Sequence, residues 1–307
     1  MSRVLRIGTR DSELAVWQAL QVKDRLQDLG ETAELIHIKS AGDQDLHTPL
    51  YQIGTVGIFT RALDSALLEG SIDLAVHSLK DVPTEPAEGI IQVAVLSRGP
   101  ANDVLVCRKD LEFLENPDYP ARIATGSLRR KAQWLNRYPR HEVFPIRGNV
   151  RSRLKKLQES NWDGAIFAQA GLERIGAHPD LLLTLNWMLP APAQGAVVVM
   201  ARDGDTECFE WCRQFNDQAT TLCVRQERDF LKGLEGGCAA PIGAWAWIEA
   251  DQLHLKGNIL SPDGKQKLET ETAATIGDSF DLGKEAAAGL MVRGAGQILS
   301  TIRNGTS

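Results

Sequence analysis

The stretch Ala75-Val76-His77-Ser78-Leu79-Lys80-Asp81-Val82-Pro83 joins the end of an apolar run to a polar turn. Such an ending is typical of a buried strand in an α/β sheet. The sequence on either side of the stretch alternates between strand-like and helical patterns, as it does in α/β proteins. Two kinds of pattern precede the quoted stretch: apolar runs of the length of a strand, and apolar residues at helical spacing. One further strand-like run follows it. We expect strands over 4–7, 34–39, 72–76 and 90–96, and helices over 12–29 and 60–69.

A second unit of the same kind follows the loop 98–102. Helices are expected to start at Ser127, near Asn149 and near Gly171. Pro190-Ala191-Pro192-Ala193 is typical of a crossing segment, after which the run 196–200 is expected to return as a strand to the first domain. Strands of the second unit are expected over 104–107, 122–125, 143–146 and 165–168.

The pattern changes after Thr220. A helix to Leu234 precedes strand-like runs over 244–248, 253–259 and 266–272, with the turn Pro262-Asp263-Gly264 between the last two. One long helix is expected over 282–302. The sequence therefore predicts two α/β lobes with mixed sheets and a small α+β domain with an antiparallel sheet. The expected boundaries are 1–98 plus about 196–216 for domain 1, 102–192 for domain 2 and 219–307 for domain 3.

The segment 40–59 lacks periodicity and is rich in glycine. A structureless stretch of this length inside a compact domain is typically a functional lid or a disordered loop, and we favour a lid.

Composition excludes several classes of protein. The 307 residues carry a formal net charge of -6, which argues against a general nucleic-acid binder. The sequence has no apolar run of membrane-spanning length, no CxxC pair among its five cysteines, and no metal-spaced pair among its six histidines. We expect a cytoplasmic protein with no metal site and no membrane contact.

Basic residues are concentrated between positions 122 and 156, where Glu142 is the only acid. A solvated helix face would explain part of this run, but the positions of its arginines favour ligand binding. Arg129, Arg130 and Arg147 lie where a strand gives way to a helix, as do Arg10 and Ser12 near the N-terminus. Helix N-termini attract anions, and each guanidinium can hold a carboxylate through two hydrogen bonds. Several such turns predict a ligand with several carboxylates.

Two residues are candidates for chemistry. Asp81 is either a turn residue before a proline or an acid–base group and counter-ion for a cationic intermediate, with Ser78 and Lys80 holding acidic groups beside it. Cys238 follows Glu235-Gly236-Gly237; it is either an inert buried thiol or a site of covalent attachment on a permissive loop.

Taken in order, these segments resemble the porphobilinogen deaminase (hydroxymethylbilane synthase) family over most of the chain. The resemblance rests on motifs whose order and spacing are specific together: Leu5-Arg6-Ile7-Gly8-Thr9-Arg10-Asp11-Ser12, the stretch 75–83, Gly126-Ser127-Leu128-Arg129-Arg130, Arg147-Gly148-Asn149-Val150, Ala170-Gly171-Leu172, Gln194-Gly195-Ala196-Val197 and Glu235-Gly236-Gly237-Cys238.

The resemblance implies a three-domain transferase of haem and porphyrin biosynthesis whose first two domains are like periplasmic binding proteins. It implies a dipyrromethane cofactor joined through a thioether to Cys238, onto which four porphobilinogen units are condensed with loss of ammonia before hydrolytic release of the linear tetrapyrrole. Asp81 occupies the catalytic position. The cofactor positions are Ser78, Lys80, Thr125, Ser127, Arg129, Arg130, Arg147 and Gly148, with Cys238. The substrate positions are Arg10, Ser12, Arg147, Arg153, Arg174 and Gln194.

This sequence departs from the family pattern at two places. Val56 stands where the family commonly has lysine in the lid, and Gly126 stands where a serine is usual. We expect the same reaction and a monomer, with the contribution of the lid left open. The alternatives are a non-catalytic two-lobed anion-binding or sensing protein, and an RNA-binding protein, which the scarcity of aromatic residues beside the arginines disfavours.

Overall fold

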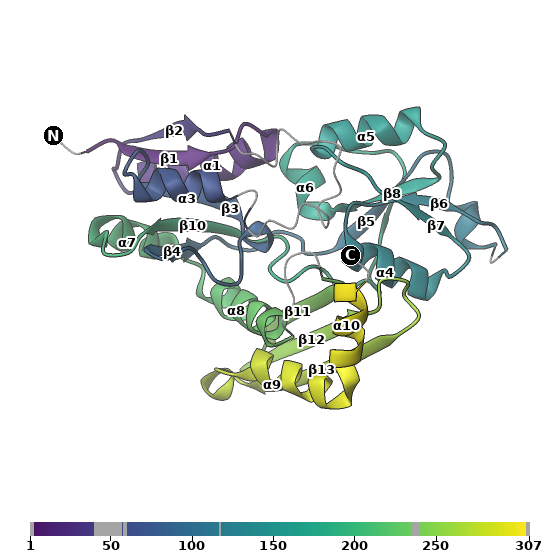
Figure 1. Cartoon of the computed structure of the whole chain (residues 1–307). Coiled ribbons are helices and arrows are strands. Elements are labelled where there is room, and N and C mark those ends of the chain that lie inside the picture. The colour runs from purple at the N-terminus through teal and green to yellow at the C-terminus, as the bar shows by residue number, and fades with distance from the viewer. Residues whose placement is uncertain (1–2, 40–56, 58–59, 117, 235–239, 305–307) are drawn as a thin grey trace. The chain divides into compact units, whose positions relative to one another are not determined.

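A computed structural model describes residues 3–39, 57, 60–116, 118–234 and 240–304 (Figure 1). The described residues form two compact units. The first contains the described residues up to Gly99 together with Gly195–Leu222, and the second contains Pro100–Gln194 and the described residues from Cys223 onward. The boundaries of the three domains expected from the sequence stay a proposal.

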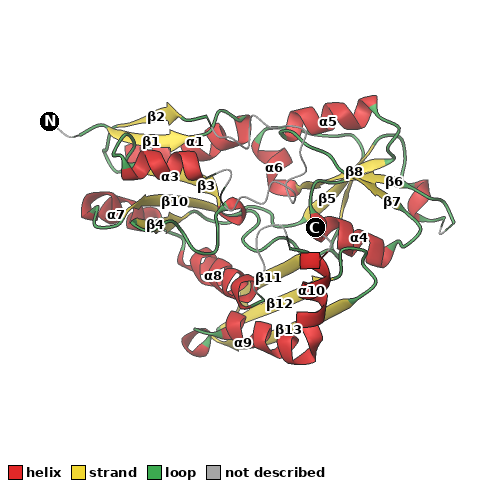
Figure 2. Cartoon of the chain, viewed as in Figure 1, coloured by secondary structure: helices red, strands yellow, loops and turns green. Residues whose placement is uncertain are grey.

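The first unit is built on a five-stranded mixed sheet in the order β2-β1-β3-β10-β4 (Figure 2). Strands β1, β2 and β3 run parallel, whereas β10 is antiparallel to both β3 and β4. The strands are β1 (Leu5–Thr9), β2 (Ala33–His37), β3 (Leu74–Ser78), β4 (Ile90–Val95) and β10 (Val197–Arg202). The helices are α1 (Glu13–Asp28), α3 (Arg61–Leu68), α7 (Thr206–Cys212) and the start of α8 (Gln218–Gly233).

Both faces of this sheet are covered. Leu5, Ile7 and Val76 pack with buried residues of α1 and α7 on one face. On the other face, Gly8 lies so close to Ile72 and Leu63 that a Cβ atom there would meet an Ile72 methyl at 2.3 Å. A sheet buried on both faces presents its polar residues at the ends of its strands, which is where function is expected.

The second sheet repeats this arrangement in the order β7-β6-β8-β5-β9. Strands β6, β7 and β8 are parallel, and β5 is antiparallel to β8 and β9. Trp134 packs on one face and Leu157 with Leu172 on the other. The elements are β5 (Asp103–Cys107), β6 (Arg122–Ala124), α4 (Leu128–Arg137), β7 (Glu142–Phe144), α5 (Val150–Glu159), β8 (Gly164–Ala168), α6 (Gln169–Arg174) and β9 (Leu182–Thr184).

The C-terminal part forms a three-stranded antiparallel sheet in the order β11-β12-β13. Its apolar face packs against α8, α9 and α10. The elements are β11 (Ile242–Glu249), β12 (Gln252–Leu260), β13 (Lys267–Thr275), α9 (Leu282–Leu290) and α10 (Gly296–Asn304). The predicted fold class, with two mixed α/β sheets and an antiparallel α+β part, is confirmed.

Several predicted boundaries were wrong. The strand expected over 72–76 is β3, Leu74–Ser78, because Ile72 still hydrogen-bonds to Ala66 in the turn out of α3. The strand expected over 143–146 ends at Phe144, since Pro145 has no N–H with which to continue the ladder. The helix expected over 282–302 is interrupted at Gly294, whose φ of +102° is not helical. Strand β9 was not predicted, because three partly exposed residues carry little periodicity.

Two glycines of α9 provide a test of its packing. A Cβ atom at Gly283 would lie 2.1 Å from the carbonyl oxygen of Gln226 in α8, whereas a Cβ atom at Gly289 would meet no described atom within 4 Å apart from its own chain neighbours and helix backbone. We expect Gly283→Ala to lower the free energy of unfolding by about 1–3 kcal/mol, because the helices must separate. Gly289→Ala is the matched control and should raise it by up to about 1 kcal/mol through helix propensity. Urea unfolding of both variants measures this; equal effects would contradict the packing.

Candidate functional site

The carboxyl ends of β1 and β3 gather one part of the predicted site. These strands are parallel neighbours, so the residues that follow them lie at the same edge of the sheet. Arg10 and Ser12 follow β1, and Ser12 caps α1 by accepting a hydrogen bond from the N–H of Ala15 at 3.3 Å. Ser78 ends β3 and accepts a hydrogen bond from Nε2 of Gln18 at 2.7 Å.

A single tight turn holds Lys80 and Asp81. Leu79–Asp81 forms one turn of 3₁₀ helix directly after β3. The N–H of Leu79 donates to the carbonyl of Ala196 at 3.0 Å, and the N–H of Val82 donates to the carbonyl of Leu79 at 3.2 Å. Asp81 is half-buried. The backbone of the turn is therefore held by hydrogen bonds, and Asp81 as a residue is partly exposed.

His77 lies directly before this turn and is buried. Its Nε2 atom has no hydrogen-bond partner among the described residues. Burial, assisted by the charge of Arg10, lowers the pKa of His77 to about 4. The imidazole is therefore neutral near pH 7 and adds no charge beside Arg10.

The neutral state of His77 predicts a pH dependence of stability. Between pH 6.5 and about 4 the unfolded chain binds a proton at this histidine and the folded chain does not, so stability falls as the pH falls. The cost at pH 5 should be about 2 kcal/mol. In the His77→Phe variant, the loss of unfolding free energy between pH 7 and pH 5 should be smaller by this amount. His141, whose pKa is also lowered by burial, remains in both proteins, so it cancels in the difference. An identical slope in wild type and variant would contradict the prediction.

In the second sheet, α4 begins shortly after the carboxyl end of β6, as α1 begins shortly after β1 in the first sheet. Ser127 caps this helix, accepting from the N–H of Arg130 at 3.4 Å, and the Oγ1 of buried Thr125 accepts from the N–H of Ser127 at 3.2 Å. A cavity of about 50 Å³ adjoins this turn, lined by Thr125, Gly126, Ser127, Leu128, Lys131, Val143, Phe144, Pro145, Ile146 and Arg147. Lys131 was not among the residues predicted for the site. A Cβ atom at Gly126 would lie 2.6 Å from the carbonyl of Ile146, so the neighbouring chain approaches closely here.

Arg129 and Arg130 are buried and paired with one carboxylate. Nη1 of Arg129 lies 2.7 Å from Oδ2 of Asp103, and Nη2 of Arg130 lies 2.8 Å from Oδ1. Burial opposes the ionisation of Asp103, but the two guanidinium groups outweigh it and hold the pKa of this carboxyl far below its usual range. Sequence analysis missed Asp103; an acid at the start of the apolar run 104–107 was the available signal.

The remaining arginines of the predicted site come after the parallel strands β7 and β8. Arg147 and Gly148 follow β7 and precede α5; Arg147 is buried, and Gly148 has a φ of +114°, which favours glycine. Nε of Arg153 donates to the carbonyl of Gly148 at 2.7 Å. Arg174 ends α6, the helix that follows β8, and burial lowers its pKa.

Gln194 is buried, and its Nε2 donates to Oδ1 of Asp103 at 2.8 Å and to the carbonyl of Ala101 at 2.7 Å. Cys238 lies outside the described residues, and so does the segment 40–59 predicted to be a lid, including Val56 but not Gly57.

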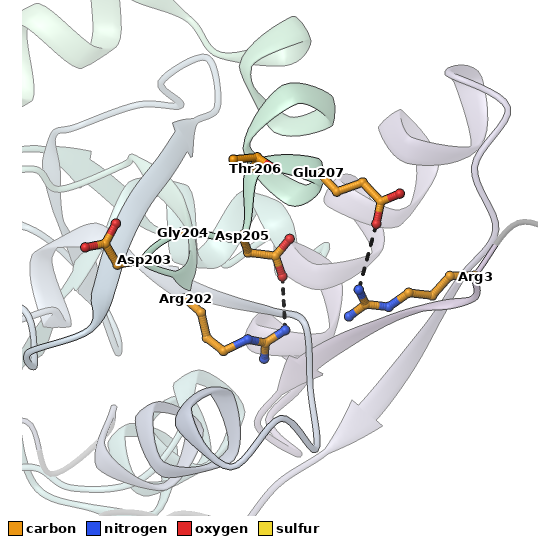
Figure 3. Close-up of a pocket in the computed structure, with 7 residues that line it drawn as sticks. All are labelled: Arg3, Arg202, Asp203, Gly204, Asp205, Thr206 and Glu207. Atoms are coloured by element: carbon orange, nitrogen blue, oxygen red, sulfur yellow. Dashed lines mark hydrogen bonds and ion pairs between the residues drawn. The ribbon is translucent and has the colours of Figure 1, made fainter.

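A wider hollow of about 380 Å³ lies in the first unit, at the carboxyl end of β10, and is lined by residues 3 and 202–207 (Figure 3). Its lining carries two arginines and three acids, so its net charge is negative. Arg202 pairs with Asp205 at 3.0 Å and Arg3 with Glu207 at 3.9 Å. This hollow lacks the excess positive charge expected of a polycarboxylate site, although it is the larger of the two.

Among the residues that the structure describes, there is no cluster of three or more histidine, cysteine, aspartate or glutamate side chains able to hold a metal ion. A search of the same residues finds no helix long and apolar enough to cross a membrane.

Comparison with known proteins adds independent information. Residues 5–210 match the sequence model described as "Porphobilinogen deaminase, dipyromethane cofactor binding domain", and residues 221–291 match "Porphobilinogen deaminase, C-terminal domain". The porphobilinogen deaminase of Pelotomaculum thermopropionicum is 41% identical over 99% of this chain and 98% of its own length. That of Carboxydothermus hydrogenoformans is 40% identical over the same shares. Among solved structures, the periplasmic aliphatic sulphonate binding protein SsuA of Escherichia coli is similar, with 14% identity, a TM-score of 0.38, and coverage of 76% of this chain and 70% of its own.

Proposed function

The chain belongs to the porphobilinogen deaminase family of transferases, which bind a dipyrromethane cofactor, and we propose that it is a working hydroxymethylbilane synthase. Four porphobilinogen units would be condensed in turn, each with loss of ammonia, and the linear tetrapyrrole would then be released by hydrolysis. The observation that carries the proposal is that both family domains match in order, over residues 5–210 and 221–291. Membership of an enzyme family supports this proposal over the non-catalytic alternative.

Residues at the start of α4 fit a cofactor with carboxylate arms. Nε of buried Arg129 has no hydrogen-bond partner among the described residues, and a cavity adjoins Thr125 and Ser127. The proposed holding residues are Ser78, Lys80, Thr125, Ser127, Arg129, Arg130, Arg147 and Gly148, with the thiol of Cys238 as the covalent anchor. When bound, dipyrromethane supplies the pyrrole carbon to which the first substrate unit is joined.

The arginines would bind the substrate through its carboxylates. Porphobilinogen carries an acetate and a propionate arm, so each added ring brings two negative charges. We assign this binding to Arg10, Arg147, Arg153 and Arg174, with Ser12 and Gln194 as hydrogen-bonding partners. Forked guanidinium groups suit carboxylates because they form two charge-assisted hydrogen bonds at once.

Asp81 would act on the reacting centre. In each condensation the C–N bond of the aminomethyl group breaks, ammonia leaves, and a C–C bond forms as a pyrrole carbon loses its proton. The departing ammonia leaves a cation on the substrate, which the negative charge of the Asp81 carboxylate would stabilise. The same carboxylate can transfer protons at the leaving amine and the pyrrole nitrogens.

The proposed anchor also bears on where the protein works. Formation of a thioether requires a free thiol, and a reducing compartment keeps thiols free. We therefore propose a cytoplasmic enzyme. The monomeric state stays a prediction.

A product assay tests the proposed function. Purified protein incubated with porphobilinogen should release four molecules of ammonia for each linear tetrapyrrole detected by mass spectrometry, and heat-denatured protein should release none. Binding of porphobilinogen without release of ammonia would refute the proposed function and favour a binding protein.

A further inference from the structure

The carboxylate of Asp103 is the centre of a buried polar cluster in the second unit. Asp103 is 0% exposed. It accepts hydrogen bonds from Nη1 of Arg129 at 2.7 Å, from Nε of Arg130 at 3.0 Å and from Nε2 of Gln194 at 2.8 Å. Two guanidinium groups and one carboxylate leave a single net positive charge inside the protein.

The topology of the sheet explains how an acid reaches this position. Strand β5 is antiparallel to β8, so its first residue, Asp103, pairs with Ala168, the last residue of β8. Since β8 is parallel to β6, this is also the edge at which β6 leads into Thr125 and Ser127. Asp103 therefore lies at the edge of the sheet where α4, which carries Arg129 and Arg130, begins.

The bonds of Asp103 fix one side of each guanidinium. Nη1 of Arg129 also donates to the carbonyl of Leu189 at 2.6 Å, and Nη1 of Arg130 donates to the carbonyl of Ile166 at 3.0 Å. Nε of Arg129 is buried and lacks a partner among the described residues. A buried donor without an acceptor costs free energy, so an anionic ligand that supplied one would be favoured.

We propose that Asp103 is a positioning residue, which orients Arg129 and Arg130 to receive a carboxylate of the cofactor. This inference rests on the proposed function, in which these arginines hold dipyrromethane. A role in orientation and a role in charge predict opposite changes in the affinity for the anionic cofactor when the carboxylate is lost. If charge alone mattered, its removal would raise the local positive charge and tighten anion binding. If orientation matters, its removal weakens binding although the charge becomes more favourable.

The Asp103→Asn variant separates the two effects, because it keeps the shape of the side chain and removes its charge. Intact-mass spectrometry of the purified variant gives the fraction that carries two linked pyrrole units. We expect this fraction to be several-fold lower than in wild type. Incubation with porphobilinogen should then load the remainder, with a half-loading concentration about tenfold higher than for wild-type protein prepared without cofactor. An unchanged or lower half-loading concentration would overturn the proposal.

Asp73→Asn is the matched control. Asp73 is also 0% exposed and pairs with Arg6 and Arg202, but it lies directly before β3, at the amino end of that strand. Its loss should lower the melting temperature and leave cofactor loading unchanged. If loading fell as much in Asp73→Asn as in Asp103→Asn, the effect would be one of general stability and the proposal would fail.

A double variant keeps the test open if Asp103→Asn does not fold. Combining it with Gln194→Glu restores a carboxylate within the cluster, beside Arg130, whose Nη2 lies 3.5 Å from Oε1 of Gln194. Stability should recover because the net charge is restored. Loading should stay impaired, since the carboxylate no longer bridges both guanidinium groups. Full recovery of loading would show that charge suffices and would contradict the positioning role.

Arg130→Gln distinguishes this inference from the proposed function. If Arg130→Gln loads cofactor normally, the arginine pair does not hold the cofactor, and both the assignment of Arg130 and the role of Asp103 fail. If Arg130→Gln loads poorly and Asp103→Asn loads normally, only the inference about Asp103 fails.

Discussion

Asp81→Asn should lower the turnover of porphobilinogen by about 10²–10⁴-fold, the range expected when a general acid–base group is lost. The substitution keeps the size of the side chain and removes both its charge and its ability to exchange a proton. The turn that holds it should survive, because its hydrogen bonds run through the backbone of Leu79, Val82 and Ala196. The melting temperature and the mass of the bound cofactor should therefore remain close to those of wild type.

Single-turnover release of ammonia measures the chemical step for this variant. Asp11→Asn is a suitable control: Asp11 lies near the same edge of the first sheet, is exposed, and its Oδ1 lies 3.0 Å from Nδ1 of His37. Its loss should change turnover by less than about twofold, as is usual for an exposed contact between two side chains. Near-normal turnover in Asp81→Asn would exclude the proposed role of its carboxylate.

Cys238→Ser should abolish covalent attachment of the cofactor. A serine hydroxyl is a far weaker nucleophile than a thiol near neutral pH, so the thioether has no counterpart in the variant. The intact mass should fall by two linked pyrrole units beyond the change from sulfur to oxygen. Turnover should fall by at least about a hundredfold, because the growing chain has no anchor.

Cys208→Ala is the control for this experiment. Cys208 is buried in α7, and burial raises the pKa of its thiol to about 12, so it remains protonated and unreactive. Its loss should leave the added mass in place. Wild-type protein that is active at its unmodified mass would exclude Cys238 as the anchor.

Local signals in the sequence predicted the elements well. Ser12, Ser127 and Asn149 each cap a helix through a side-chain oxygen, as their positions after apolar runs suggest. Capping depends on a few adjacent residues, which is why sequence reveals it. The break at Gly294 was missed because glycine is tolerated inside helices, and only its φ of +102° shows that the helix stops.

The candidate site was predicted through the residue types that follow each strand. Arg10 and Ser12 after β1 and Asp81 after β3 come to one edge because β1 and β3 are parallel. Thr125 and Arg147 come to one edge because β6 and β7 are parallel. An alternation of strands and helices is enough to predict this, since parallel strands end on the same side of a sheet.

The sequence by itself determined the family, the α/β class and which basic and acidic residues make up the candidate site, because these depend on local periodicity and on motifs of adjacent residues. Only the tertiary structure decided that Arg129 and Arg130 share the buried carboxylate of Asp103. Asp103 belongs to a strand that reaches this edge by antiparallel pairing with β8, a partner some sixty residues further along the chain. Strand pairing over such a separation is governed by the packing of the whole sheet, and the local sequence around Asp103 does not encode it.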